Sequence, residues 1–215
     1  MKRICVFCGS NNGASPIYLK TAEVVGTFLA VNNIELVYGG GRVGLMGKIA
    51  DSVMASGGKV IGVIPQSLAD KEVAHNGLSE LHIVGSMHER KALMAELADG
   101  FIALPGGFGT FEEFCEIVTW AQLGFHSKPC GLLNVGGFYD NLTAMFDFAT
   151  TEKFIRKEHR KLVLIECEIE ILFELMKNFS PPIIEKWLVD ILSNQTETVM
   201  DWRFLSRNSN EHRIS

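Results

Sequence analysis

The chain has 215 residues, of which 47% are hydrophobic and 21% are charged, so it is globular with room for one sizeable core rather than disordered. Its formal net charge of −5 argues against a broad nucleic-acid-binding face, while leaving room for one local basic pocket for a small anion. The absence of a signal-peptide pattern and of a long apolar span, together with an odd count of five cysteines, predicts a cytoplasmic protein with reduced thiols.

Seven short apolar runs alternate with helical patterns along the chain. The runs, which we expect to be buried strands, cover residues 3–8, 35–38, 60–64, 81–84, 101–104, 131–134 and 162–165. Helices are expected at about 16–32 and 44–56, and a polar loop over 66–79. A third helix is expected to begin at residue 86, and a fourth to follow the glycine turn at 106–109 and end at about 124. A fifth is expected to begin at about 139, and a short sixth to end at about 176. This alternation predicts an α/β protein with a doubly wound parallel sheet of about seven strands and helices on both faces.

One domain is expected over residues 1–192, because no internal linker or repeat interrupts the pattern. Pro181-Pro182 breaks the alternation, and one more short helix is expected at about 185–192. The segment 193–215 is predicted to be a polar C-terminal tail.

Three glycine-rich turns follow predicted strands: Gly9-Ser10, Gly39 to Gly41, and Gly106 to Gly109. In an open parallel sheet, ligands bind beyond the carboxyl ends of the strands. Glycines let a backbone approach a ligand closely, and the first N–H groups of a helix favour negative charge. Together the three turns predict a nucleotide-sized anion site, with the turn that begins at Pro105 as its floor.

The second turn also matches the G-x-G-x-x-G pattern of dinucleotide-binding proteins, in residues 39–44. That function requires an acidic residue at the end of the following strand, about 20 residues on. The strand ends in Val63-Ile64-Pro65-Gln66 instead, and the match follows the second strand rather than the first. We therefore interpret these residues as a glycine turn at the strand ends, and we predict no cofactor.

Arg90 stands early in a predicted helix, where the helix dipole disfavours a cation. Ser86 and Glu89 form a capping-box pattern at the start of this helix. Arg90 shares a stripe with Leu93, Met94 and Leu97, so it is expected to point toward the edge of the core. Two interpretations stay open: pairing with a local carboxylate, or binding of a phosphate or a developing charge.

Glu113 also has two interpretations. Thr110 and Glu113 have the spacing of a capping box, with Thr110 as N-cap and Glu113 three residues later. A carboxylate beside a phosphate-binding turn is otherwise unfavourable, because like charges repel. That cost indicates a purpose, such as stabilising a cationic transition state or positioning water.

Neither the cysteines nor the histidines indicate a metal site. Cys5 and Cys8 are three positions apart on a predicted strand, so their side chains should face opposite sides of the sheet. His75, His82, His88, His126 and His159 lack metal-ligand spacing, and a role for His88 beside the candidate site stays open.

Five motifs resemble those of the Lonely Guy family of cytokinin riboside 5′-monophosphate phosphoribohydrolases. They are YGGGRVGLMG at 38–47, MHERK at 87–91, PGGFGTFEE at 105–113, TWAQLG at 119–124 and Lys128-Pro129, within a similarity that covers about residues 2–180. Position 42 departs from the family, since Arg42 stands where many members have a small residue. Some members are labelled lysine decarboxylases, but no pyridoxal-phosphate site is recognisable.

The resemblance implies a Rossmann-like fold, a homodimer, and hydrolysis of the bond between base and ribose in a purine nucleoside 5′-monophosphate. It implies that Arg90 and Glu113 are the catalytic pair. The residues that it implies to bind substrate are Gly9, Ser10, Gly41, Glu72, Met87, Lys91, Gly107, Phe108, Gly109, Thr110, Phe111, Glu112 and Thr119. No metal, nucleic acid or membrane partner is expected. A general AMP or purine nucleotide nucleosidase and a non-catalytic nucleotide-binding module are the alternatives.

Overall fold

The computed structural model describes residues 1–70 and 74–182. The predicted helix at 185–192, the tail at 193–215, the domain boundary at 192 and Glu72 lie outside these residues. Among the described helices, none has the length and apolar character that a membrane span requires.

Seven strands form one sheet in which every neighbouring pair is parallel. They are β1 (Arg3–Phe7), β2 (Glu35–Tyr38), β3 (Val60–Pro65), β4 (Glu80–Val84), β5 (Gly100–Ala103), β6 (Cys130–Leu133) and β7 (Val163–Glu166). The prediction of seven parallel strands is confirmed, with each end placed within one residue. The strand order β4-β3-β2-β1-β5-β6-β7 reverses direction between β1 and β5.

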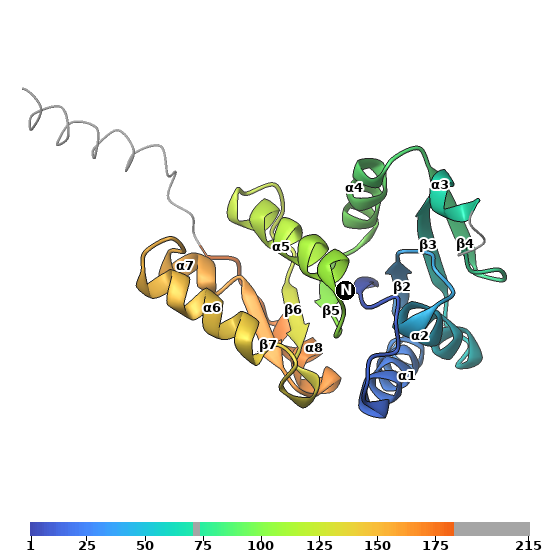
Figure 1. Cartoon of the computed structure of the whole chain (residues 1–215), viewed down its shortest axis with the longest axis horizontal. Coiled ribbons are helices and arrows are strands. Elements are labelled where there is room, and N and C mark those ends of the chain that lie inside the picture. Colours follow the sequence, from blue (N-terminus) through green and yellow to red (C-terminus); the bar gives the residue numbers. More distant parts are fainter. Residues whose placement is uncertain (71–73, 183–215) are drawn as a thin grey trace, which may run out of the picture. The chain divides into compact units, whose positions relative to one another are not determined.

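The helices lie on both faces of the sheet, as predicted (Figure 1). The long ones are α1 (Pro16–Val31), α2 (Gly44–Ala55), α4 (Met87–Leu97), α5 (Phe108–Gln122), α6 (Asp140–Thr151) and α8 (Ile169–Lys177). Three short elements were not predicted: α3 (Gln66–Ala69) within the expected polar loop, the 3₁₀ turn η1 (Val135–Gly137) and α7 (Lys157–Arg160). Each is only three or four residues long, which is too short for a helical period to show in the sequence.

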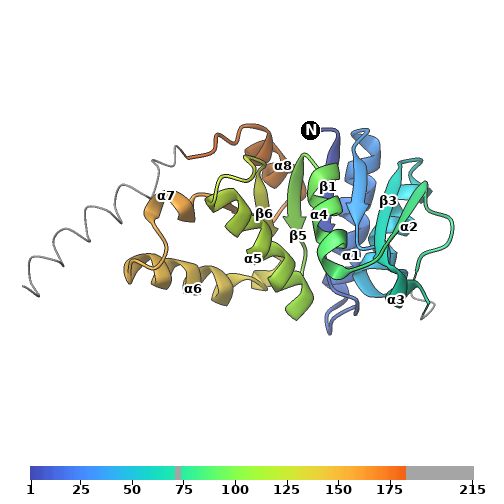
Figure 2. The ribbon, with the colours of Figure 1, turned by 90° about the horizontal axis from the view of Figure 1, so that it is seen from above.

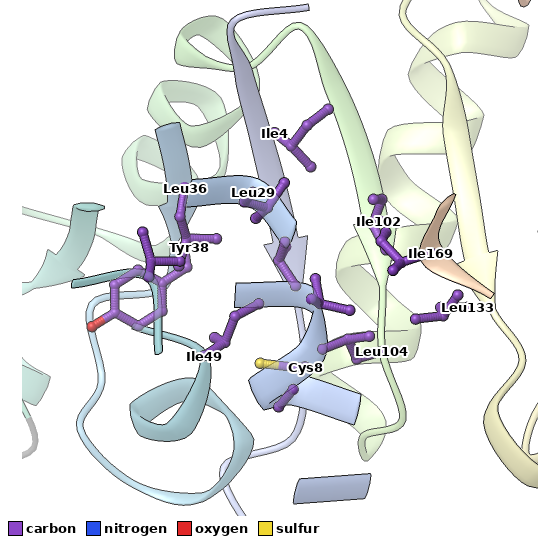
Figure 3. Close-up of a cluster of buried hydrophobic side chains, with 14 of the residues drawn as sticks. Ile4, Cys8, Leu29, Leu36, Tyr38, Ile49, Ile102, Leu104, Leu133 and Ile169 are labelled. Carbon is purple, nitrogen blue, oxygen red and sulfur yellow. The ribbon is translucent and has the colours of Figure 1, made fainter. Parts of the chain in front are cut away.

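Alternating strand residues divide the core into two layers, because successive side chains point to opposite faces of the sheet. One layer packs α1, α2 and α8 against residues such as Ile4, Leu36 and Ile102 (Figure 3). The other packs α4 and α5 against residues such as Phe7 and Phe101. Helices α4 and α5 are neighbours in both views of the ribbon (Figures 1 and 2).

Cys5 belongs to the α4/α5 layer and Cys8 to the α1/α2/α8 layer, which confirms that the two thiols face opposite sides of the sheet. Both are buried, and burial raises the pKa of each thiol, so neither is a reactive thiolate. The pair is structural rather than redox-active.

Candidate active site

A pocket of about 640 Å³ opens where the strand order reverses, beyond the carboxyl ends of β1 and β5. This is the position at which open α/β sheets bind ligands. All three predicted glycine turns contribute to its wall, through Gly9 after β1, Gly39 and Gly41 after β2, and residues 106–109 after β5. The sequence-based expectation that the three turns meet is confirmed.

The N-terminus of α5 lies in this wall and is a candidate anion cradle. Gly107 is the N-cap, no side chain caps the helix, and its first turn contains no acidic residue. A Cβ added at Gly107 or Gly109 would meet no protein atom within 4 Å, so bare backbone faces open space there. Neither residue is among the glycines with positive φ, so their own conformation does not require glycine. The first helical N–H groups are therefore available to a ligand.

Thr110 closes the base of the cradle. It is buried, lines the pocket, and packs closely against Gly106, where a Cβ would overlap the Thr110 side chain. Gly9 donates its N–H to the Pro105 carbonyl at 3.0 Å, which joins the turn after β1 to the turn after β5.

The predicted capping box at Thr110 and Glu113 is wrong. Helix α5 begins three residues earlier than that pattern requires, with Gly107 as its N-cap, so Thr110 and Glu113 both lie inside the helix. The N–H of Phe111 donates to the Gly107 carbonyl, which is the first bond of the helical ladder. Glycine is an acceptable N-cap, and here it leaves the helix end free for a ligand. Glu113 therefore has no capping function.

Arg90 lies at the edge of the core, as predicted, and its side chain is 11% exposed. Its Nε donates to the Val63 carbonyl at 3.2 Å and one Nη donates to the Gly39 carbonyl at 3.3 Å. The guanidinium thus satisfies carbonyl groups at the ends of β2 and β3. A Cβ at position 39 would overlap the guanidinium, so glycine is required there to admit Arg90.

Glu113 faces Arg90 across the pocket wall, with 3.7 Å between its Oε1 and an Arg90 Nη. Its side chain is 12% exposed, and both residues line the pocket. Burial raises the pKa of Glu113 above its ordinary value of 4.5, an effect that the Arg90 charge partly offsets. A desolvated carboxylate beside a cation, in a pocket with an anion cradle, is a feature of catalytic sites.

The capping box at the start of α4 is confirmed in a shifted form. The Ser86 hydroxyl accepts from the Glu89 N–H at 3.1 Å, and the Glu89 carboxylate accepts from the Gly85 N–H at 2.8 Å. This cap fixes the first turn of α4, from which Met87 and Arg90 reach the pocket.

The structure brings most of the predicted site residues to this one pocket. Those that line it are Gly9, Ser10, Gly41, Met87, Arg90, Gly107, Phe108, Gly109, Thr110, Glu112 and Glu113. Phe108 is 93% exposed at the rim. Within the described residues, Lys91, Phe111 and Thr119 are not part of the pocket lining.

These three side chains have contacts elsewhere. Phe111 packs on the rings of Phe138 and Tyr139, and the Thr119 hydroxyl donates to the Cys115 carbonyl one turn before it. Lys91 forms ion pairs with carboxylates of α5. His88 is exposed and is not among the lining residues.

Several lining residues were not predicted. Asn11 and Asn12 follow the first glycine turn, and Tyr18 and Phe138 form an edge-to-face aromatic pair at one wall. The apolar lining residues include Met46, Ile64, Leu68 and Met87. Met46 and Met87 belong to the motifs at 38–47 and 87–91, and Met87 was predicted to bind substrate. The others come from separate elements outside these motifs, so only their tertiary placement identifies them. Within residues 1–70 and 74–182, no group of three or more His, Cys, Asp or Glu side chains is arranged to hold a metal ion.

Comparison with known proteins agrees with this geometry. Residues 46–176 match the family model described as "possible lysine decarboxylase". The chain is 48% identical over 180 residues to the probable cytokinin riboside 5′-monophosphate phosphoribohydrolase LOGL9 of Oryza sativa subsp. japonica, which covers 84% of this chain and 79% of the relative. It is 47% identical over 180 residues to the phosphoribohydrolase LOG2 of Arabidopsis thaliana, which covers 84% of each chain.

Among solved structures, the fold is similar to that of a molybdenum cofactor binding protein from Rippkaea orientalis, with a TM-score of 0.63, 23% identity, and coverage of 83% of this chain and 97% of the other. A molybdenum cofactor carrier protein from Chlamydomonas reinhardtii has a TM-score of 0.60 and 20% identity, over 82% and 96% of the two chains. At such identities the likeness establishes the Rossmann-like fold alone. From the curated relatives and the matched family model, the chain belongs to the Lonely Guy family.

Proposed function

We propose that this protein is a phosphoribohydrolase that hydrolyses the N-glycosidic bond of a purine nucleoside 5′-monophosphate, of the cytokinin or adenine type, to free base and ribose 5-phosphate. The observation that carries the proposal is the buried Arg90–Glu113 pair beside the open N-terminus of α5 in one pocket. Relatives with 47% and 48% identity over most of the chain are named for this activity.

The 5′-phosphate would bind at the α5 cradle, through the N–H groups from Gly107 to Thr110 and the Thr110 hydroxyl. Glu113 lies four residues beyond Gly109, a rise of about 6 Å along the helix. That separation is comparable with the span of a ribose 5-phosphate, so the anomeric carbon would lie near the carboxylate. Phosphate binding remote from the reacting bond would supply energy for its orientation.

Breaking the glycosidic bond places positive charge on the ribose, while the oxygen of water bonds to the anomeric carbon and a proton is transferred to the departing base. The Glu113 carboxylate would stabilise the positive charge or orient the water, as carboxylates do in glycoside hydrolysis. Arg90 would hold Glu113 and anionic groups in place. The apolar lining residues Met46, Ile64, Leu68 and Met87 suit a flat, weakly polar base.

A cytoplasmic location and a homodimer are part of the same proposal. All five cysteines are free, which supports a reducing compartment. Exposed aromatic side chains such as Phe108, Phe125 and Phe154 support a further protein contact. Size-exclusion chromatography with light scattering distinguishes a monomer from a dimer.

The direct test is incubation with AMP, isopentenyladenosine monophosphate and the other nucleoside 5′-monophosphates, with free base and ribose 5-phosphate as the readout. The proposal predicts both products from at least one purine monophosphate and far less from the matching free nucleoside. Equal turnover of AMP and the cytokinin nucleotide would indicate a general purine nucleotide nucleosidase. Saturable AMP binding with no release of base would identify a non-catalytic binding module and overturn the proposal.

A further inference from the structure

The catalytic pair of the proposed function joins two helices, because Arg90 belongs to α4 and Glu113 to α5. In helix α4 only Arg90 and Met94 are fully buried, and Leu93, Ala95 and Leu97 pack partly buried against the core. By contrast, α1 and α2 each present a buried apolar face to the core. The apolar contacts of α4 are with the sheet, so the distance between the Arg90 guanidinium and the Glu113 carboxylate also depends on polar contacts that join α4 to α5.

Lys91 makes such a contact. Its Nζ lies 2.5 Å from Oε1 of Glu112, and 3.0 and 2.9 Å from the two carboxylate oxygens of Glu116. Glu112 and Glu116 are one turn apart on α5 and flank Glu113. Lys91 directly follows Arg90, so the bridge connects the two helices beside the catalytic pair.

The Lys91 side chain is 11% exposed, so its ammonium is well shielded from water. Partial burial lowers the pKa of Lys91, but the hydrogen bonds and charges of Glu112 and Glu116 together raise it by more. The net shift is upward, so Lys91 stays charged. Two carboxylates occupy its donors, and Lys91 does not line the pocket within the described residues. These contacts are those of a structural bridge rather than of a substrate ligand.

We propose that Lys91 is a positioning residue, whose ion pairs with Glu112 and Glu116 hold α4 against α5 and so set the separation of Arg90 and Glu113. The proposal rests on the proposed function for its kinetic consequence. It differs from the substrate contact that the family resemblance implies for Lys91. A positioning residue affects the chemical step, whereas a ground-state contact affects binding.

The first test is steady-state kinetics of Lys91→Met with the best nucleoside monophosphate. Misplacement of a catalytic pair by about 1 Å costs on the order of 100-fold in rate, so we expect kcat to fall at least about 10-fold with KM within about 3-fold. Lys91→Arg, which keeps the charge, should restore most of kcat. A loss confined to KM, or no loss at all, would overturn the proposal.

Two further variants test whether activity depends on the ion pair between the helices rather than on a lysine at position 91. The charge-exchanged pair Lys91→Glu with Glu116→Lys rebuilds the ion pair across the helices, so it should recover activity that Lys91→Glu alone loses. Failure to recover would contradict a positioning role. Lys48→Met is the matched control, because it breaks the α2–α1 ion pair of Lys48 with Glu23 at 3.1 Å, outside the pocket lining. It should leave kcat unchanged.

A measurement without substrate keeps this inference separate from the proposed function. Hydrogen exchange at the Arg90 Nε–H, followed by NMR, reports whether Arg90 remains bonded to the Val63 carbonyl. We expect faster exchange in Lys91→Met, and in the milder Glu116→Gln, but not in Lys48→Met. Unchanged exchange in the first two variants would overturn the inference even in an active enzyme. A wild-type protein inactive on every nucleotide would refute the proposed function instead.

Discussion

The two ends of the pocket are built in different ways. The cradle at the start of α5 consists of consecutive residues, uses backbone N–H groups, and contains no charged side chain in the first helical turn. The Arg90–Glu113 pair consists of two buried, charged side chains from separate helices. Binding an anion requires only a free helix end, whereas catalysis requires charges whose pKa and separation are set by the surrounding fold.

The difference predicts that damage to the pair lowers kcat, whereas damage to the cradle raises KM. Breaking each end separately therefore tests whether phosphate binding and bond cleavage reside where the geometry indicates.

The largest effect is expected from Arg90→Ala, which removes the cation of the pair and the donor to two strand-end carbonyls. Activity should fall about 1,000-fold or more, in line with the loss of a preorganised electrostatic group. Circular dichroism and thermal unfolding should show a folded protein, although a less stable one, because the Val63 and Gly39 carbonyls lose their donor. Activity lost only in proportion to unfolded protein would instead make Arg90 a structural residue.

A smaller loss is expected from Gly39→Ala, which leaves Arg90 present but displaces it. The added Cβ would overlap the guanidinium, so Arg90 must leave the carbonyl groups that hold it. We expect kcat to fall about 100-fold, the cost of misplacing a catalytic group by about 1 Å. A normal kcat together with an unchanged chemical shift of the Arg90 Nε–H would show that the Cβ at position 39 does not displace Arg90.

At the cradle, Gly109→Ala should separate stability from binding. Position 109 lies in the first turn of α5 and a Cβ there meets nothing in the protein, so alanine should raise the free energy of unfolding by up to about 1 kcal/mol. The same methyl group would obstruct a phosphate, and KM should rise about 10-fold, equivalent to about 1.4 kcal/mol, with little change in kcat. An unaltered KM would show that the phosphate does not bind at this turn.

The mildest test is pH. Burial raises the pKa of Glu113 above 4.5, and the Arg90 charge reduces that increase. If the ionised carboxylate is the active form, kcat/KM should decline on acidification with an apparent pKa above 4.5. A pH–rate profile measures this limb, which should be absent from the residual activity of Glu113→Gln.

The raised pKa of Glu113 should also affect stability, but stability should fall as pH rises, whereas activity should increase. A carboxyl whose folded-state pKa is raised contributes its stability fully below its unfolded pKa, and this contribution is lost as pH rises through the folded value. The Tm of Glu113→Gln relative to wild type should therefore increase as pH rises above 4.5. A difference in Tm between the two proteins that does not change with pH would show that folding does not raise the pKa of Glu113.

Local sequence patterns predicted much of this molecule. The apolar runs and the glycines after them located the seven strands of the described residues and the edge of the sheet at which the pocket lies, because strand ends and glycine turns are short-range features. The stripe of Arg90 with Met94 predicted the inward direction of the arginine, and the buried Met94 confirms it.

The prediction was wrong where one motif has two structural solutions. Thr110 and Glu113 have capping-box spacing, yet Gly107 caps the helix. A glycine N-cap uses no side-chain hydrogen bond, so the sequence pattern did not distinguish it from a cap at Thr110. Ile64 and Leu68 reach the pocket from outside the sequence motifs, and the bridge of Lys91 to Glu112 and Glu116 joins helices distant in sequence, so no local pattern predicts them.

The proposed function requires that Glu113 acts in bond cleavage rather than in folding or binding, and Glu113→Gln separates these roles. Glutamine keeps the size of the side chain and removes the charge. We expect this variant to be folded, to bind AMP with a Kd within about 3-fold of wild type, and to have a kcat at least about 100-fold lower. Release of free base by this variant at the wild-type rate would exclude a catalytic role for Glu113.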